Sequence, residues 1–567
     1  MTSSTSYSSD AFNSLPFREK LELLYTVSGR EKRDLILGSP DAQRLVRSFA
    51  VESLFYTVKE IGLEDSPELL ALASGSQVQG LVDLDCWKKD RLDTDSLLDW
   101  LEALVEGGSL PVAEFLNAVD LDLLVLLLKR FIRVYRTDDP DEPPEIEGPE
   151  VFELDEHYPI VFHRWDARAP LIRDLLEELY ERDYSYFVTV MEDIWWGVES
   201  QLEEASFQVR NARLQDRGFP DFFEALEIYR PLAEAELPER IEVLGRDARD
   251  EEDDVPLEKA LLVPEPERSF LSEVLDRVLT EHGGDEIRRE MAFLTNRVMV
   301  AEGVDFSDRD AVRAAVTLAH DTVNLGLEHL SHGDRRQAVE VIRRRYLQHL
   351  FRVGWGLLHS LRRRAKRAEE TLGLPSSFSE VEFLDTPYRE ALAGFLRPKP
   401  RYFEAIDARG QTGYRAFASV RDVDRAGEVV EDLAALPDLV VRFLGQSLPE
   451  LATLRPSNAD DFRLSAVLLT GFANSVLGRG PSLQPLDAED LSRLRRATAD
   501  SESAGLRTEV REQFLGSVGR TSGYLEFCLR RFEEEFLPIM PQFAYDPRYI
   551  TCLMVATPAP PAADARR

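Results

Sequence analysis

Cysteine is scarce in this chain of 567 residues, and its three copies, Cys86, Cys528 and Cys552, lie far apart. A disulfide framework and a zinc knuckle both need closely spaced cysteines, and no CxxC pair occurs. The N-terminal stretch "MTSSTSYSSDAFNSL" also lacks the basic segment followed by an apolar one that a secretion signal requires. We therefore expect a cytoplasmic protein.

Long apolar runs and an excess of positive charge are also missing. The most apolar stretch, "LDLLVLLLKRFIRV" from Leu121, is interrupted by Lys129 and Arg130, well short of the ~20 residues that span a membrane. It predicts a buried helix and no membrane span. With 104 acidic and 68 basic residues the formal net charge is -36, which opposes the approach of nucleic acid or anionic lipid. We therefore expect protein partners rather than nucleic acid.

Motifs that bind nucleotides or activate nucleophiles are absent from the sequence. No P-loop and no GxGxxG after a strand occurs, and "GQSLP" at Gly445 lacks the second glycine of a GxSxG elbow. His329 and His332 lie three residues apart on a predicted helix and can share a metal, but they are not part of an HExxH pattern. Histidines in a last helical turn also interact favourably with the helix C-terminus. We therefore predict no metal and no cofactor.

What the sequence does contain is helical periodicity. The stretch "LDTDSLLDWLEALVEGG" begins with an N-capping residue, repeats apolar residues three and four apart, and ends at a glycine pair. Alternation predicts a short β-hairpin in "VFELDEHYPIVFHRW" from Val151, and "GYRAFASV" from Gly413 is a second strand candidate. These patterns predict an all-α fold of stacked helix pairs, similar to an α-solenoid, with a minor β-hairpin.

Acidic segments predict the domain boundaries. Residues 137–150 hold seven acids and four prolines, and residues 247–258 hold seven acids and one base, so neither segment can bury enough apolar surface to fold. The predicted division is a disordered tail at 1–14, a helical array at 15–136, an acidic linker at 137–150, a β-hairpin with a helical body at 151–246, a second acidic linker at 247–258, a helical body with a basic helix at 259–372, a C-terminal helical body at 373–556 and a disordered tail at 557–567.

The helical array contains an internal repeat of apolar positions. The positions are Leu45, Val46, Phe49, Leu54, Val58 and Ile61, then Leu69, Leu70, Ala73, Val78 and Val82, then Phe115, Leu116, Val119, Leu124, Leu128 and Phe131. Helices this short cannot bury their apolar faces alone, so we expect them to stack. The pattern resembles the helical arrays of MgtE-type cytosolic domains and of flagellar switch proteins.

Several sequence segments, spread over most of the chain, resemble those of a bacterial family of unknown function. They are "LPFREKLELL", "KEIGLED", "DLDCWKKDRLD", "RNARLQDRGFPDFFEALEIY", "TNRVMVAEGVDF", "NLGLEHLSHGD" and "LFRVGWGLL". The resemblance implies a soluble, acidic, mainly helical bacterial protein. It transfers no catalytic or binding residue.

One predicted helix carries a row of arginines. Arg210, Arg213 and Arg217 lie at positions i, i+3 and i+7 of "FQVRNARLQDRGFPDFFEALEIY" and share one helix face. Like charges four residues apart destabilise a helix, so we expect an anionic group opposite Arg213 and Arg217. Acids on a neighbouring helix and an external anion or acidic partner are both compatible with this row.

The stretch "RRRYLQHLFRVGWGLLHSLRRR" is the most basic part of the chain. Residues 334–367 hold eleven bases and two acids. A basic ridge on one face of one predicted helix consists of Arg345, His349, Arg352, Gly356, His359 and Arg363, spaced four and three residues apart. Gly356 is expected to let another backbone or a ligand approach closely. The ridge can face acids of the same chain, an acidic protein or a phosphate backbone.

These observations lead to one favoured function and two alternatives. Helical arrays, acidic linkers and the lack of an assembled catalytic motif favour a non-enzymatic protein-interaction scaffold or regulator. The first alternative is an enzyme or small-anion sensor whose site lies between bodies and uses Arg345, His349, Arg352 and His359. The second is a weak binder of phosphate backbones, whose retention of nucleic acid would fall steeply with salt.

Overall fold

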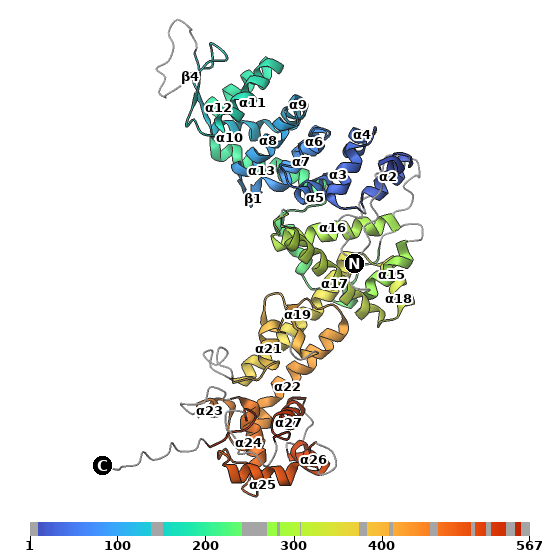
Figure 1. Cartoon of the computed structure of the whole chain (residues 1–567), viewed down its shortest axis with the longest axis vertical. Coiled ribbons are helices and arrows are strands. Elements are labelled where there is room, and N and C mark those ends of the chain that lie inside the picture. The colour runs from blue at the N-terminus through green and yellow to red at the C-terminus, as the bar shows by residue number, and fades with distance from the viewer. Residues whose placement is uncertain are drawn as a thin grey trace, which may run out of the picture. The chain divides into compact units, whose positions relative to one another are not determined.

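The protein is mainly helical throughout the part of the chain that its computed structural model describes. The described residues are 9–25, 27–137, 151–240, 269–279, 284–306, 308–373, 383–407, 412–453, 463–500, 505–517, 523–539 and 550–556. The predicted all-α class with a minor β-hairpin is confirmed (Figure 1). The linker predicted at 247–258, residues 138–150 of the first linker and the tail at 557–567 lie outside the described residues.

The described helices give no indication of a membrane-spanning segment. Among the described residues, none of the helices is both long enough and apolar enough to cross a membrane.

The chain forms two compact units, each assembled from segments that are distant in sequence. The first is Met1–Tyr229, Pro238–His320 and Ile342–Gln348, and the second is Arg230–Leu237, Asp321–Val341 and His349–Arg567. The predicted division at the acidic linkers stays a prediction.

The elements have the following bounds. The helices before residue 240 are α1 (Ser9–Asn13), α2 (Phe17–Leu24), α3 (Gly29–Leu37), α4 (Ala42–Arg47), α5 (Val51–Ile61), α6 (Pro67–Leu70), α7 (Gly75–Asp85), α8 (Thr94–Glu106), α9 (Ser109–Ala118), α10 (Leu121–Lys129), α11 (Ala169–Arg182), α12 (Tyr184–Trp196), α13 (Glu199–Asp216) and α14 (Phe222–Leu226), with 3-10 turns η1 (Glu227–Tyr229) and η2 (Glu234–Glu236). The later ones are α15 (Phe270–Leu279), α16 (Gly284–Glu302), α17 (Arg309–Ser331), α18 (Arg335–Arg344), α19 (Leu347–Leu372), α21 (Tyr388–Leu396), η4 (Glu404–Ile406), α22 (Val420–Leu444), α23 (Leu448–Thr453), α24 (Leu464–Val476), α25 (Ala488–Thr498), α26 (Thr508–Ser517) and α27 (Gly523–Glu535). The strands are β1 (Trp87–Lys88), β2 (Arg91–Leu92), β3 (Ile132–Val134), β4 (Val151–Phe152), β5 (Ile160–Phe162), β6 (Tyr402–Phe403) and β7 (Tyr414–Arg415).

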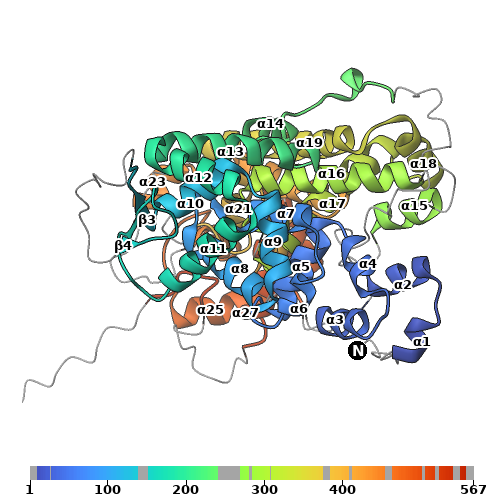
Figure 2. The ribbon, with the colours of Figure 1, turned by 90° about the horizontal axis from the view of Figure 1, so that it is seen from above.

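Short helices of the first unit stack on one another in sequence order. Helix α5 packs against α3 and α7, α7 against α9, and α10 against both α12 and α13 (Figure 2). A capping box starts α7, because the Ser74 side chain accepts a hydrogen bond from the Gln77 N–H while the Gln77 side chain accepts one from the Ser74 N–H. The middle of α10, Leu123–Leu128, is buried all round, as expected of a helix enclosed by neighbours.

Helix α1 lies within the stretch that the sequence predicts to be a disordered tail. Residues Ser9–Asn13 are helical, and the Phe12 side chain is fully buried. The Nζ of Lys20 stands 5.7 Å from the centre of the Phe12 ring. One large apolar side chain therefore anchors a segment whose polar composition resembles that of a tail.

The hairpin predicted from Val151 is confirmed, and a third strand joins it. Strands β4 and β5 pair antiparallel, and β3 pairs with the other edge of β5, with Ile132 opposite Phe162 and Val134 opposite Ile160. The prediction of a helix running through "FIRV" is therefore wrong, because α10 ends at Lys129. Side chains of β3 alternate between buried and exposed, which suits a strand with one covered face. The candidate at Gly413 is also a strand, β7, paired with β6.

The predicted basic helix is two helices. Helix α18 ends at Arg344 and α19 begins at Leu347, so Arg345 and Tyr346 form a corner between them. The placement of Arg345 on the same helix face as His349 is therefore wrong. The remaining positions of the basic ridge lie on α19.

A glycine of α19 allows close helix packing, but it is Gly354 rather than the predicted Gly356. A Cβ added to Gly354 would lie 2.1 Å from the carbonyl oxygen of Thr322 on α17, and one added to Gly326 would lie 2.0 Å from that of Leu350. The backbones of α17 and α19 therefore touch at this crossing, where no side chain fits. A Cβ on Gly356 would meet only ordinary contacts at 3.8 Å or more.

A buried carboxylate ties the helices of the C-terminal body together. Asp385 accepts hydrogen bonds from the N–H and hydroxyl of Ser465 on α24, at 3.0 and 2.5 Å, and from the Tyr524 hydroxyl on α27 at 2.6 Å. Its ion-pair partner is Arg531, also on α27, at 2.7 Å. Asp385 is 1% exposed, so these donors depend on its two buried oxygens, and replacing one oxygen by an amide NH2 group would leave the donors of that oxygen without an acceptor.

We expect Asp385→Asn to lower the free energy of local unfolding of α24 and α27 by about 3 kcal/mol, because it breaks a buried ion pair. Hydrogen exchange of peptides from these two helices measures that energy. Asp438→Ala, at an exposed position of α22, is the control and should change it by less than about 0.5 kcal/mol. Unchanged protection in the Asp385 variant would show that the network is not a structural tie.

Candidate functional site

The predicted row of arginines lies on α13 and faces carboxylates of the same unit. Arg213 donates from Nε and Nη2 to the two carboxylate oxygens of Asp83 on α7, at 2.8 and 2.7 Å, and from Nη1 to Asp120, just before α10, at 2.6 Å. Arg210 donates to the carbonyl oxygen of Asp83 at 2.7 Å, and Arg217 to that of Ser76 at 3.3 Å. The guanidinium of Arg213 is thus held on two sides by the chain's own acids.

Burial shifts the pKa values in this cluster. It lowers the pKa of the Arg210 guanidinium to about 10, and it raises the pKa of the Asp120 carboxyl although Arg213 acts in the opposite direction. The side chain of Asp83 is almost fully buried, so this ion pair is enclosed in the first unit. Use of these arginines by an external partner stays a prediction.

The basic ridge is contacted by a preceding segment of the chain. Arg352 donates from Nε to the carbonyl oxygen of Arg230 at 2.8 Å, and the Leu232 N–H donates to the Arg352 carbonyl oxygen at 3.4 Å. His349 is buried, and His359 is half-buried. The middle of the ridge therefore faces backbone of the same unit.

The two ends of the ridge differ in exposure. Arg363 is exposed on α19. Arg345, at the corner before α19, lies 3.8 Å from the carboxylate of Glu239. Binding of an anion or a partner by the ridge stays a prediction.

His329 and His332 do not lie on one helical face. Helix α17 ends at Ser331, and His332 follows it with a φ of +51°, in the left-handed region. The i, i+3 spacing therefore does not bring the two rings together in the way a continuous helix would. No group of three or more metal-ligating side chains is positioned to hold a metal within the described ranges.

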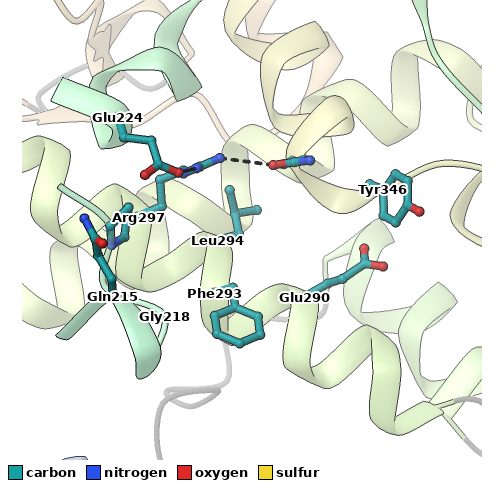
Figure 3. A pocket seen from close by; sticks show the side chains of 10 residues that line it. Gln215, Gly218, Glu224, Glu290, Phe293, Leu294, Arg297 and Tyr346 are labelled. Atoms are coloured by element: carbon teal, nitrogen blue, oxygen red, sulfur yellow. Dashed lines mark hydrogen bonds and ion pairs between the residues drawn. The ribbon is translucent and has the colours of Figure 1, made fainter. Parts of the chain in front are cut away.

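A pocket of about 420 Å³ lies in the first unit, where three segments meet. Its lining comes from the end of α13 and the turn into α14 (Gln215, Gly218, Pro220 and Glu224), from α16 (Glu290, Phe293, Leu294 and Arg297), and from the corner before α19 and its start (Tyr346 and Gln348). Figure 3 shows Glu290 and Tyr346 at one end and Glu224 with Arg297 at the other, with Phe293 and Leu294 between them. The pocket therefore has polar ends and an apolar middle.

Arg240 stabilises the corner between α18 and α19, which forms one wall of the pocket. Its N–H donates to the carbonyl oxygen of Arg344 at 2.8 Å, and its guanidinium donates to the carbonyl oxygens of Ile342 and Arg345 at 3.4 and 3.2 Å. The guanidinium also lies 4.8 Å from the centre of the Tyr346 ring. The last carbonyls of a helix have no partner within it, so a cation at this place ends α18 and turns the chain.

Glu290 connects that corner to α16. Its carboxylate lies 2.6 Å from Nη1 of Arg240 and accepts a hydrogen bond from the Leu347 N–H, the first residue of α19, at 3.0 Å. Burial nevertheless raises the pKa of the Glu290 carboxyl. Burial therefore disfavours the ionised form of Glu290, which lies at the pocket.

At the opposite end of the pocket, hydrogen bonds connect three side chains. Arg297 donates to the Glu224 carboxylate at 2.6 Å and to the Gln348 side-chain oxygen at 3.1 Å (Figure 3). Gly218 has a φ of +84°, and a Cβ there would lie 2.0 Å from the Phe293 ring. Only glycine lets the turn after α13 approach α16 so closely.

The charges and shape of the pocket limit what it can bind. Its lining includes two carboxylates and one guanidinium, and two donors of that guanidinium already bind Glu224 and Gln348. The pocket therefore offers few free donors to an anion. An apolar group matches the Phe293 and Leu294 surface, while each of the two acids already has one arginine partner, Glu224 with Arg297 and Glu290 with Arg240.

A comparison with protein families matches residues 9–556, nearly the whole chain. The chain belongs to the family of unknown function DUF6178. The resemblance to a family of unknown function is therefore confirmed. No curated protein and no solved structure matches this DUF6178 chain. The likeness of its array to MgtE-type and flagellar switch arrays stays a prediction.

Sequence reasoning did not find the pocket of this DUF6178 protein. Its lining residues are spread over about 130 positions, from Gln215 to Gln348, and none belongs to a known motif. One local signal was available: Pro220 and Asp221 are followed by two phenylalanines, Phe222 and Phe223, at the start of an amphipathic stretch. Two adjacent large apolar residues at a helix start cannot both face the core, since they point in directions about 100° apart.

We expect Arg213→Ala to lower the local unfolding free energy of α7 and α13 by about 3 kcal/mol, because Asp83 would become an unpaired buried charge. Hydrogen exchange of the two helices is the measurement. Arg30→Ala, at an exposed position of α3, should have almost no effect. An equal effect of both substitutions would contradict the role of the ion pair.

The raised pKa of Glu290 predicts a pH dependence. Just above the ordinary pKa, folded molecules carry more protons on Glu290 than unfolded ones, so this group's contribution to stability falls as pH rises through that range and levels off above the folded pKa. Glu290→Gln removes this component. The difference in unfolding free energy, wild type minus variant, should therefore decline as pH is raised from about 4.5. A difference that increases with pH would show that Arg240 outweighs burial.

Proposed function

We propose that the protein is a non-enzymatic interaction scaffold that binds a segment of a partner protein at the pocket of α13, α14 and α16. One observation carries this proposal: large apolar side chains are exposed at and beside the pocket. Phe223 is 78% exposed, and Phe222 and Phe293 are each 47% exposed. Phe293 lines the pocket, and Phe222 and Phe223 directly precede Glu224, which also lines it. Exposed aromatic side chains around a pocket are typical of surfaces that a partner covers.

The occupant is a segment that presents a large apolar side chain next to a lysine or arginine. The apolar middle of the pocket, at Phe293 and Leu294, accepts the first group. The carboxylates of Glu224 and Glu290 at its two ends each bind one arginine of the chain, and a carboxylate has further lone pairs that can accept from the second group. The net charge of -36 attracts a basic partner over longer distances and accelerates its association.

The setting of this scaffold is a reducing cytoplasm of a bacterial cell. The three cysteines support it, since Cys86, Cys528 and Cys552 are all free and buried. The geometry does not favour the enzyme or anion-sensor alternative, because Nε of Arg352 already donates to a backbone carbonyl. The acidic surface also gives no advantage to a phosphate backbone.

Selection from a random library of displayed twelve-residue peptides tests the proposal. We expect the wild-type protein to enrich sequences with a large apolar residue adjacent to lysine or arginine, at ~0.15 M salt, where unspecific attraction is screened. The double variant Phe222→Ser with Phe223→Ser should lose this enrichment. Both side chains are largely exposed, so the substitutions should leave the fold intact.

The matched control is Leu110→Ser, which removes another exposed apolar side chain, on α9. It should enrich the same peptides as the wild type. The proposal fails if the wild type selects no common pattern, if acidic sequences are enriched, or if the double variant selects the same peptides as the wild type.

A further inference from the structure

A pair of tryptophans is exposed at the C-terminal end of α12. Trp196 is 69% exposed and Trp195 42%, and their rings meet edge to face with centres 4.5 Å apart. Tryptophan carries the largest apolar side chain and is highly buried on average. Two of them in contact with solvent form a surface that a partner can cover.

The same helix end already holds two cations from neighbouring elements. The guanidinium of Arg136 lies 5.5 Å from the centre of the Trp195 ring. Lys129 donates from Nζ to the carbonyl oxygen of Ile194 at 2.5 Å. A helix C-terminus carries partial negative charge, and the face of an indole ring attracts cations. The fold therefore uses this helix end to hold positive groups.

Negative charge beside Trp196 is not neutralised by the rest of the described chain. Asp193 lies three residues before Trp196, on the same face of α12. Among the described residues, the carboxylates of Asp193 and Asp122 form no ion pair and no hydrogen bond, whereas the neighbouring Glu192 accepts from the Tyr158 hydroxyl at 2.6 Å. Burial, and then the charges of Asp122 and Glu192, raise the pKa of Asp193.

We infer that Trp196 and Asp193 form a second docking surface, which binds a lysine or arginine side chain of a partner protein. The cationic group lies over the exposed Trp196 ring and pairs with the Asp193 carboxylate, as Arg136 and Glu192 already do one position along the helix, at 3.7 Å from each other beside Trp195. An anionic membrane would meet the same exposed rings, but the acids around them oppose it. The surface uses no residue of the pocket, so it goes beyond the proposed scaffold site.

A titration with a defined peptide tests this surface. The probe is a fluorescent octapeptide in which glycine alternates with lysine and arginine, measured by anisotropy at ~0.15 M salt. We expect Trp196→Ala and Asp193→Asn each to weaken binding about 3- to 30-fold, the range of an exposed to a partly desolvated cation–π contact. Trp196→Phe keeps an aromatic face and should fall between wild type and the alanine variant.

Three controls separate binding at this surface from unspecific charge attraction and from binding at the pocket. Asp95→Asn removes one charge from an exposed site on α8 and should leave the affinity unchanged, as should Phe223→Ala at the pocket. The same peptide with glutamate in place of its bases should not bind. In nitrogen–proton spectra, the indole N–H of Trp196, assigned with the phenylalanine variant, should shift on addition of the basic peptide.

Two results would overturn the inference. One is equal affinity of the wild type and Trp196→Ala for the basic peptide. The other is Trp196-dependent binding to vesicles of phosphatidylcholine and phosphatidylserine, which would assign the tryptophans to a membrane. Failure of the pocket variants in peptide selection would leave this titration unaffected, because the two surfaces share no residue.

Discussion

Arg213 shares one guanidinium between two carboxylates, Asp83 and Asp120, which lie 130 and 93 residues before it in sequence. Asp83 is the buried partner and Arg213 is half-buried, and a buried carboxylate must be paired, because taking it out of water costs several kcal/mol that only a close cation offsets. The rigid fork of donors of Arg213 also fixes the rotation and translation of α13 against α7 and α10. The end of α13 then places Gly218 against Phe293, so the wall of the pocket depends on a pair of charges elsewhere in the unit.

Several arginines in and around the basic segment are bound to groups of the same chain. Arg240 satisfies the carbonyls that end α18 and binds Glu290, and Arg352 binds the carbonyl of Arg230. These arginines therefore serve the fold as partners of backbone carbonyls and of buried acids. The chain has 36 more acids than bases, and within the described ranges the half-buried Asp193 and Asp122 are two acids without a basic partner. The net charge of the molecule is therefore negative, although arginines make several of the contacts that hold its helices in place.

Periodicity and capping signals were enough to predict the helical class, the hairpin at Val151 and the strand at Gly413, because these depend on neighbours in sequence. The corner at Arg345 was not predicted, since the spacing of four and three residues continues through it without interruption. Contacts with Arg240 and Glu290, 105 and 57 residues away from the backbone groups they bind, decide that break. Gly354 was overlooked in favour of Gly356 for the same reason: its role depends on Gly326 of another helix. The candidate site combines three such distant segments, and so no local pattern could reveal it.

Exposed aromatic side chains normally cause self-association, and the charge of this chain counters that tendency. Two copies that each carry a net charge of -36 repel one another, and this repulsion opposes the pairing of Phe223 or Trp196 with a second copy. For the proposed surfaces, the same net charge also distinguishes between possible partners. A neutral protein gains only the apolar contact, an acidic one is repelled, and a basic one gains both the contact and the attraction. In the two surfaces that we propose, exposed rings lie beside acids, and this combination favours a basic partner in a way that neither feature provides alone.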